Sequence, residues 1–148
     1  GDPMPTETHV GPMTTLPKYK KIVDYIDVAH SDGANCVLGG KSYNRADAQG
    51  AKFVEPTIFT NVSNDMRIAE EEVFRPILAV IPFDTEEEVI EIGNDIVFGL
   101  AAGVWTSDIG RALRVADKLK AGTVWVNIYR AVSFTSPFGG HKRSGQGR

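Results

Sequence analysis

Short apolar segments with strand character alternate with segments of helical periodicity along most of the chain, and this alternation constrains the fold more than any other feature. The first helical segment repeats apolar side chains at the spacing i, i+3, i+4 and i+7, which is one face of an α-helix. These side chains are Tyr19, Ile22, Val23 and Ile26. The strand-like segments are residues 36–38, 53–62 with an interruption at Pro56, 77–81, 100–105 and 123–126. Strands that alternate with helices predict an α/β fold, a layered sheet with flanking helices.

Local signals predict where the helices begin and end. The first helix begins near Pro17, where a missing N–H costs no hydrogen bond, and ends at Gly33. A capping box at residues 85–88 opens a second helix. A third helix begins at Asp108 and ends at Gly122. Its predicted apolar face consists of Ile109, Ala112, Leu113, Ala116 and Leu119.

Two of the remaining segments carry structural predictions. Residues 36–38 form a short apolar run, which predicts a buried strand. Residues 41–52 are polar and are predicted to form a surface loop.

The composition excludes several classes of protein. The chain has 148 residues, of which 42% are hydrophobic and 24% charged, as in one ordinary globular domain. Sixteen Lys and Arg against nineteen Asp and Glu give a net charge of -3, so charge provides no reason to expect nucleic acid as a partner. No apolar run approaches the roughly 20 residues that span a bilayer, so we expect no membrane partner.

Cysteine and histidine usage bears on compartment and metal binding. Cys36 is the only cysteine, so no internal disulfide can form; reducing and oxidising compartments both remain open, and the cytoplasm is favoured. None of His9, His30 and His141 lies three or four residues from another, and Cys36 has no cysteine partner. We therefore expect no metal site.

Two segments have unusual composition. The cluster Glu70–Glu72 ends against the apolar residues 73–76, which favours one carboxylate pressed into a cleft, where it can accept hydrogen bonds from a sugar diol. The segment Pro137–Arg148 is rich in glycine and basic side chains. Composition alone indicates a disordered basic tail, whereas Gly139 and Gly140 also suit a turn where the backbone passes close to another segment.

Six segments, read in order, carry a family resemblance. They are Gly11-Pro12, Pro56–Ile58, Met66–Phe74, Asn94-Asp95 with Phe98–Val104, Ala121–Asn127 and Pro137–Arg148. In this order and spacing they resemble the C-terminal part of the catalytic domain of the NAD(P)-dependent aldehyde dehydrogenase superfamily. The resemblance covers nearly the whole chain, and it implies that residues 1–148 are a partial catalytic domain.

The resemblance implies roles for four residues. Glu72 matches the glutamate that hydrogen-bonds the nicotinamide ribose, and Phe74 matches the aromatic residue beside that ribose and the nicotinamide. Val132 and Phe138 fall where the family lines the aldehyde tunnel, and the small Val132 implies a wider pocket. The implied cofactor is NAD or NADP, the implied substrate is an aldehyde oxidised to a carboxylic acid, and the implied assembly is a homo-oligomer.

The resemblance also implies what the family has beyond these residues. Its nucleophilic cysteine, general-base glutamate and Rossmann domain lie upstream, and its closing oligomerisation strand lies downstream. Cys36 aligns with a variable segment, so we expect no catalytic residue within the chain and no turnover by it alone. Arg75 stands where the family usually has glycine.

An alternative hypothesis stays open beside the enzymatic one. In it the chain is a free-standing, non-catalytic remnant domain that acts as a binding or self-associating module through exposed apolar patches. Upstream coding sequence with a Gly-Gln-x-Cys type nucleophile motif would decide for the enzyme.

Overall fold

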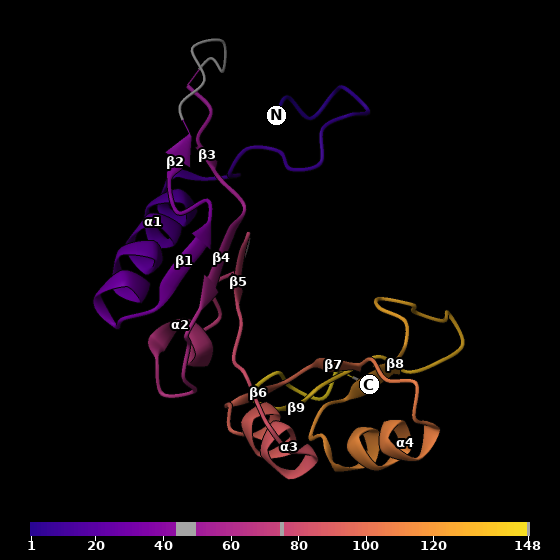
Figure 1. Ribbon diagram of the computed structural model, residues 1–148. Helices are drawn as coiled ribbons and strands as arrows, with labels where there is room; N and C mark the ends of the chain where they lie inside the picture. Colours follow the sequence, from indigo (N-terminus) through magenta and orange to yellow (C-terminus); the bar gives the residue numbers. More distant parts are fainter. Residues whose placement is uncertain (44–49, 75, 148) are drawn as a thin grey trace. The chain divides into compact units, whose positions relative to one another are not determined.

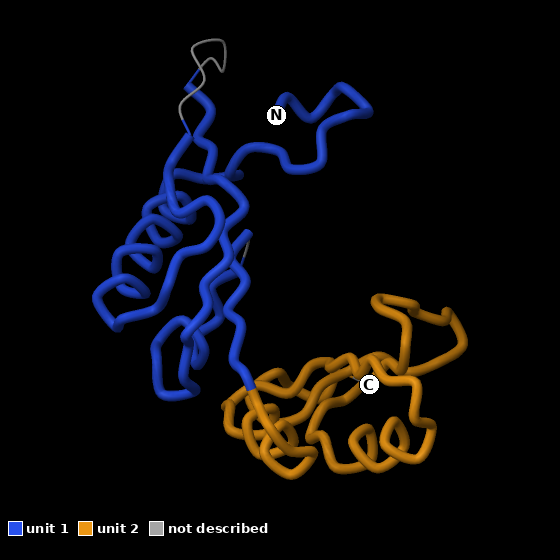
Figure 2. Tube along the Cα trace, in the orientation of Figure 1, with its two compact units in different colours: residues 1–82 blue, residues 83–148 orange. Residues whose placement is uncertain are grey.

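The computed structural model describes residues 1–43, 50–74 and 76–147. It divides into two compact units, Gly1–Pro82 and Phe83–Arg148 (Figures 1 and 2). The first unit contains α1 (Leu16–Ser31), β1 (Asn35–Leu38), β2 (Ser42–Tyr43), β3 (Phe53–Val54), β4 (Thr57–Thr60), α2 (Arg67–Glu70) and β5 (Ile77–Ala79). The second contains α3 (Glu86–Asn94), β6 (Phe98–Gly99), β7 (Ala101–Val104), α4 (Ile109–Lys118), β8 (Thr123–Val126) and β9 (His141–Lys142). The predicted α/β class is confirmed, although the strands form several small sheets.

Helix α1 forms as the sequence predicts. The Thr15 side chain accepts a hydrogen bond from the Lys18 N–H at its N-terminus, and Pro17 lies in its first turn. Gly33 follows the helix with φ of 92°, a conformation that glycine adopts without steric cost. The predicted start and stop of this helix are both confirmed.

A three-stranded sheet in the order β1-β4-β5 packs against α1 and forms the core of the first unit (Figure 1). β4 pairs antiparallel with β1 and parallel with β5. Phe59 on the central strand is fully buried. The buried residues clustered with it are Met13, Ile22, Ile26, Ala29, Ala34, Val54, Val62 and Ile68. β2 lies within residues 41–52, the segment predicted as a surface loop, and pairs antiparallel with β3, which directly follows that segment. Residues 44–49 of the predicted loop lie outside the described residues.

The opposite face of this sheet carries an exposed apolar row. Leu38, Ile58 and Leu78 are in register across the three strands, and Leu38 and Leu78 are both more than half exposed. Residues 36–38 therefore form a strand as predicted, but the prediction that this strand is buried is wrong. The physical reason is that α1 covers only the face that carries Phe59, and side chains alternate between the two faces of a strand.

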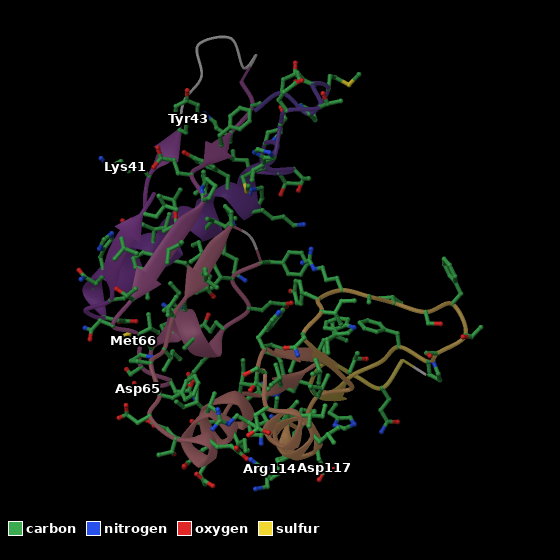
Figure 3. All side chains as sticks on the ribbon, turned by 45° about the vertical axis from the view of Figure 1, so that its right-hand side comes forward. Lys41, Tyr43, Asp65, Met66, Arg114 and Asp117 are labelled. Atoms are coloured by element: carbon green, nitrogen blue, oxygen red, sulfur yellow. The ribbon has the colours of Figure 1, made fainter. Side chains whose placement is uncertain are left out.

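The second unit contains two small sheets. β7 and β8 pair in parallel, and β6 and β9 pair antiparallel. The predicted capping box opens α3: the Glu88 N–H donates to Thr85 Oγ1 at 3.1 Å, and the Glu88 carboxylate accepts from the Asp84 N–H at 2.7 Å. Arg114 on α4, labelled in Figure 3, donates two hydrogen bonds of 2.9 Å to Glu86 and joins the two helices.

Helix α4 only partly matches its prediction. Asp108 accepts from the Arg111 N–H and begins the helix as expected, and Ala112 is buried. Ile109 and Leu113, in contrast, are exposed, because the buried stripe runs through Ala112 and Val115 instead. The helix ends at Lys118, so Gly122 does not end it.

Gly122 instead lies where the backbone of the C-terminal segment passes close by, and this contact decides between the two hypotheses for residues 137–148. A Cβ atom at Gly122 would lie 1.8 Å from the carbonyl oxygen of Gly139, so only glycine permits this close approach. Gly139 and Gly140 are buried, and the Ser144 hydroxyl accepts from the Gly99 N–H at 3.1 Å. The hypothesis of a disordered basic tail is therefore wrong for the described residues up to 147, and the close-passing turn is confirmed. Among the described residues, no helix has both the length and the apolar character to cross a bilayer.

We expect Phe59→Ala to lower the free energy of unfolding by about 3–5 kcal/mol, because it removes a large side chain from a closed core. Leu78→Ala on the exposed face is the matched control, with an expected loss below about 1 kcal/mol. Urea unfolding of both variants measures the difference. Equal losses would contradict the assignment of buried and exposed faces.

Candidate functional site

The segment that follows α2 carries the two residues expected to bind the cofactor. Glu72 is exposed, and its backbone carbonyl accepts a long hydrogen bond of 3.4 Å from Lys21 Nζ on α1. The Phe74 ring is 65% exposed, lies 6.0 Å from Lys18 Nζ and has a backbone φ of 39°. The expectation of a carboxylate pressed into a cleft is wrong for Glu72 within this unit, because the residue is exposed. Arg75 lies outside the described residues.

Glu71 is the carboxylate that the first unit holds. The Tyr25 hydroxyl donates to Glu71 Oε2, and Arg67 donates to both carboxylate oxygens at 2.7 and 3.3 Å. The hydrogen bonds from Arg67 and then Tyr25 lower the pKa of Glu71 from 4.5 to about 2. The same bond to Glu71 raises the pKa of the Tyr25 phenol. At neutral pH the pair is therefore a charged carboxylate and a protonated phenol.

The loop after β8 carries the two residues expected to line an aldehyde tunnel. Val132 and Phe138 are both exposed within the second unit. The loop is tied to the strand before it, because Trp125 Nε1 donates to the Ala131 carbonyl at 2.8 Å. The Tyr129 ring packs edge-on against Trp125, with ring centres 5.5 Å apart. These contacts hold the loop up to Ala131, and the Val132 and Phe138 side chains that follow are exposed.

Asn127 sets the direction in which this loop leaves the sheet. Its backbone has φ of 54°, a left-handed conformation that asparagine tolerates better than most residues. Its side chain accepts from the Thr106 N–H and donates to the Thr106 carbonyl, both at 2.9 Å. The Asn127 side-chain amide thereby pairs with the Thr106 backbone beyond the end of the β7–β8 pair, while the Asn127 backbone turns away from the sheet.

Cys36 has the environment of a packing residue. Its thiol is half-buried against the core of the first unit and donates to the Leu38 carbonyl, with Sγ 3.3 Å from the oxygen. A Cβ atom at Gly40 would lie 2.7 Å from this sulfur, so the surroundings are tight. Within residues 1–43, 50–74 and 76–147, no group of three or more His, Cys, Asp or Glu side chains could hold a metal ion.

The structure thus places the four predicted site residues in two pairs. Glu72 and Phe74 lie on one segment of the first unit, as an exposed carboxylate beside an exposed ring. Such a pair can accept hydrogen bonds from a diol and pack against a flat ring. Val132 and Phe138 lie on one loop of the second unit. The Tyr25–Glu71 bond and the bonds of the Asn127 amide were missed from sequence, because each joins residues far apart in the chain and no local signal points to it.

Comparison with known proteins gives consistent matches over the whole chain. The model of the Aldehyde dehydrogenase family matches residues 1–148. A betaine aldehyde dehydrogenase of Mesorhizobium japonicum is 47% identical over 148 residues, which are 100% of this chain and 30% of the relative. The chain therefore spans about a third of the length of the curated relatives it matches.

Solved structures of aldehyde dehydrogenases match at a similar sequence identity. The betaine aldehyde dehydrogenase of Staphylococcus aureus in complex with NAD+ is 45% identical with a TM-score of 0.91, and the match covers 95% of this chain and 28% of that chain. An indole-3-acetaldehyde dehydrogenase of P. syringae in complex with NAD+ is 47% identical with a TM-score of 0.89, over 94% of this chain and 28% of that chain.

We expect the stability contributed by Glu71 to depend on pH. Because its pKa is about 2 in the folded chain and 4.5 ordinarily, the contribution is complete above pH 4.5 and is lost as the pH falls toward 2. The side chain is 41% exposed, so the contribution is at most about 1 kcal/mol. The difference in unfolding free energy between the chain and Glu71→Gln should shrink on acidification. Urea unfolding across this range measures it, with Glu70→Gln as control, and a difference that grows at low pH would contradict the argument.

Proposed function

The chain belongs to the aldehyde dehydrogenase family, and on that premise we propose that it forms the part of an NAD(P)-dependent aldehyde dehydrogenase that holds the nicotinamide ribose and lines the aldehyde tunnel. The single observation that carries the proposal is the exposed pair Glu72 and Phe74, displayed on a segment that α1 holds in place. When bound, NAD or NADP supplies the acceptor for the hydride that leaves the aldehyde carbon.

The first unit fits a nicotinamide ribose. The Glu72 carboxylate offers two acceptor oxygens to a ribose diol, and charge-assisted bonds of this kind are stronger than neutral ones. The Phe74 ring beside it offers an apolar face to the sugar and the nicotinamide. Both residues orient the cofactor and neither takes part in bond making.

The second unit fits an apolar aldehyde tunnel wall. Val132 and Phe138 are exposed apolar side chains on a loop whose base is held by the Trp125–Ala131 hydrogen bond. The relatives are named for betaine aldehyde and indole-3-acetaldehyde, so the proposed substrate of the whole enzyme is an aldehyde. Substrate size would be set by these two side chains together with residues from outside the chain.

We propose further that the nucleophile, the general base and the Rossmann domain of the enzyme lie outside these 148 residues, which are a partial catalytic domain. The Cys36 thiol supports this because it is committed to the Leu38 carbonyl and is packed against the core. A cytoplasmic homo-oligomer is the proposed setting, supported by the single cysteine and by the apolar row Leu38, Ile58 and Leu78, of which Leu38 and Leu78 are exposed.

The same apolar row favours a second candidate, a non-catalytic module that associates with itself. The two candidates differ in what the coding sequence holds upstream of Gly1. A nucleophile motif in the same reading frame supports the enzyme, and an initiator codon there supports the module.

We expect the 148-residue chain alone to oxidise no aldehyde. The reaction needs a thiolate nucleophile, and Cys36 is unsuited to that role. Production of NADH and NADPH is followed with betaine aldehyde, indole-3-acetaldehyde and simple aliphatic aldehydes. Sustained turnover by the pure chain that Cys36→Ser abolishes would overturn the claim that the nucleophile lies elsewhere, because Cys36 is the only cysteine of the chain.

We expect Glu72→Gln to weaken cofactor binding in a complete enzyme. The host is a chimera in which residues 1–148 replace the matching segment of the Staphylococcus aureus betaine aldehyde dehydrogenase. Loss of charge-assisted bonds to the ribose should raise KM for NAD+ about 10- to 100-fold. Glu70→Gln, which alters the exposed neighbouring carboxylate, is the matched control and should leave KM within about twofold. An unchanged KM in Glu72→Gln would refute the assignment of the ribose site.

A further inference from the structure

One face of α1 contacts the proposed ribose-binding segment through successive side chains. Tyr25 donates to the Glu71 carboxylate, Lys21 donates to the Glu72 carbonyl, and Lys18 lies over the Phe74 ring. The three α1 residues have the spacing i, i+3 and i+7, so they form a single stripe along the helix. As the stripe runs back toward the N-terminus of α1, its partners run forward along residues 71–74.

The strongest of these contacts lies at the Tyr25 end. The Tyr25 ring is only 6% exposed and packs within the first unit, so its hydroxyl has a fixed position. Glu71 accepts hydrogen bonds from that hydroxyl and from the Arg67 guanidinium, which also lies 5.6 Å from the Tyr25 ring centre. The lowered pKa of Glu71 keeps this carboxylate charged at neutral pH. Glu71 is thus held by two hydrogen-bonding partners at once.

The extended backbone at Glu71 determines the direction of the Glu72 side chain. Glu71 ends α2 in an extended conformation, with φ of -96° and ψ of 147°. Successive side chains of an extended backbone point to opposite sides. Fixing Glu71 against α1 therefore directs Glu72 away from α1, which agrees with the exposure of Glu72.

We infer that Tyr25 and Glu71, supported by Arg67 and Lys21, are positioning residues that orient Glu72 and Phe74 for the cofactor ribose. None of the four touches the cofactor in this inference, and each acts through the 71–74 backbone. The inference rests on the proposed function, because it assigns a purpose to the geometry of that same site.

The first test uses the 148-residue chain itself. Tyr25→Phe removes one hydroxyl and keeps the buried ring, so the fold is expected to survive. Amide hydrogen exchange of Glu71, whose N–H donates to the Arg67 carbonyl at 2.9 Å, should accelerate about threefold to tenfold, in line with the loss of one hydrogen bond, while exchange in the middle of α1 stays unchanged. Unchanged exchange at Glu71 would overturn the anchoring step.

The second test uses the chimera with the Staphylococcus aureus enzyme. Tyr25→Phe and Glu71→Ala should raise KM for NAD+ about threefold to tenfold while kcat and KM for the aldehyde stay within about twofold. Glu71→Gln, which keeps an acceptor for Tyr25, should restore part of the loss. Lys21→Gln should raise KM slightly, and Lys20→Gln is its control, because Lys20 is the adjacent exposed lysine with the same charge.

A double-mutant cycle separates positioning from general damage. If Tyr25 acts through Glu72, Tyr25→Phe should add little to KM for NAD+ once Glu72→Gln is present, whereas unrelated damage would add in full. Full additivity would overturn the inference and leave the ribose assignment standing. An unchanged KM in Glu72→Gln alone would instead overturn the proposed function, so the two failures are distinguishable.

Discussion

The packing of α1 against one face of the β1–β4–β5 sheet is the interaction on which the candidate ribose site depends. Ile22 and Ile26 bury one stripe of the helix against Phe59, and this burial fixes the rotation of the helix about its axis. Once the rotation is fixed, the neighbouring stripe that ends at Tyr25 faces residues 71–74. The burial of this apolar stripe therefore determines which polar side chains of α1 contact residues 71–74, although none of the buried side chains is proposed to contact the cofactor.

The second unit is held together in a different way, by close backbone approaches and amide side chains. Few of its side chains are buried among the described residues, and Ala112 and Val115 on α4 are the main apolar ones. Gly122 lets the backbone of the C-terminal segment pass against it. The Asn94 amide holds the end of α4, because it donates to the Lys118 carbonyl and accepts from the Lys120 N–H just beyond the helix. A unit of this kind displays loops well, because its stability does not require that their side chains be buried.

The sequence predicted α1, α3, α4 and the longer strands in their order, because periodicity, caps and prolines are local signals, but it missed the two-residue strands β2, β6 and β9. The Thr85 capping box and the turn at Gly33 appear as expected. Burial was predicted less well, as residues 36–38 and Leu113 demonstrate, because an apolar side chain does not reveal whether a neighbouring element covers it.

The site was predicted only as far as the family resemblance reaches. Glu72, Phe74, Val132 and Phe138 came from motif positions, and their roles stay predictions. The Tyr25–Glu71 bond joins residues 46 positions apart, and no local pattern encodes such a pair. The two hydrogen bonds between Asn127 and Thr106 span 21 positions, so they cannot be predicted from local sequence patterns either.

The pairing of two adjacent glutamates in this segment has a physical logic. Three carboxylates, Glu70 to Glu72, follow one another here and repel. Arg67 and Lys21 offset this repulsion, since they bring two positive charges to the segment, and the bidentate Arg67 contact leaves Glu71 little freedom to compete for a ligand. The extended backbone then separates the carboxylates of Glu71 and Glu72 onto opposite sides. One acidic side chain is thereby committed to the protein, and the other keeps its acceptor oxygens for a diol.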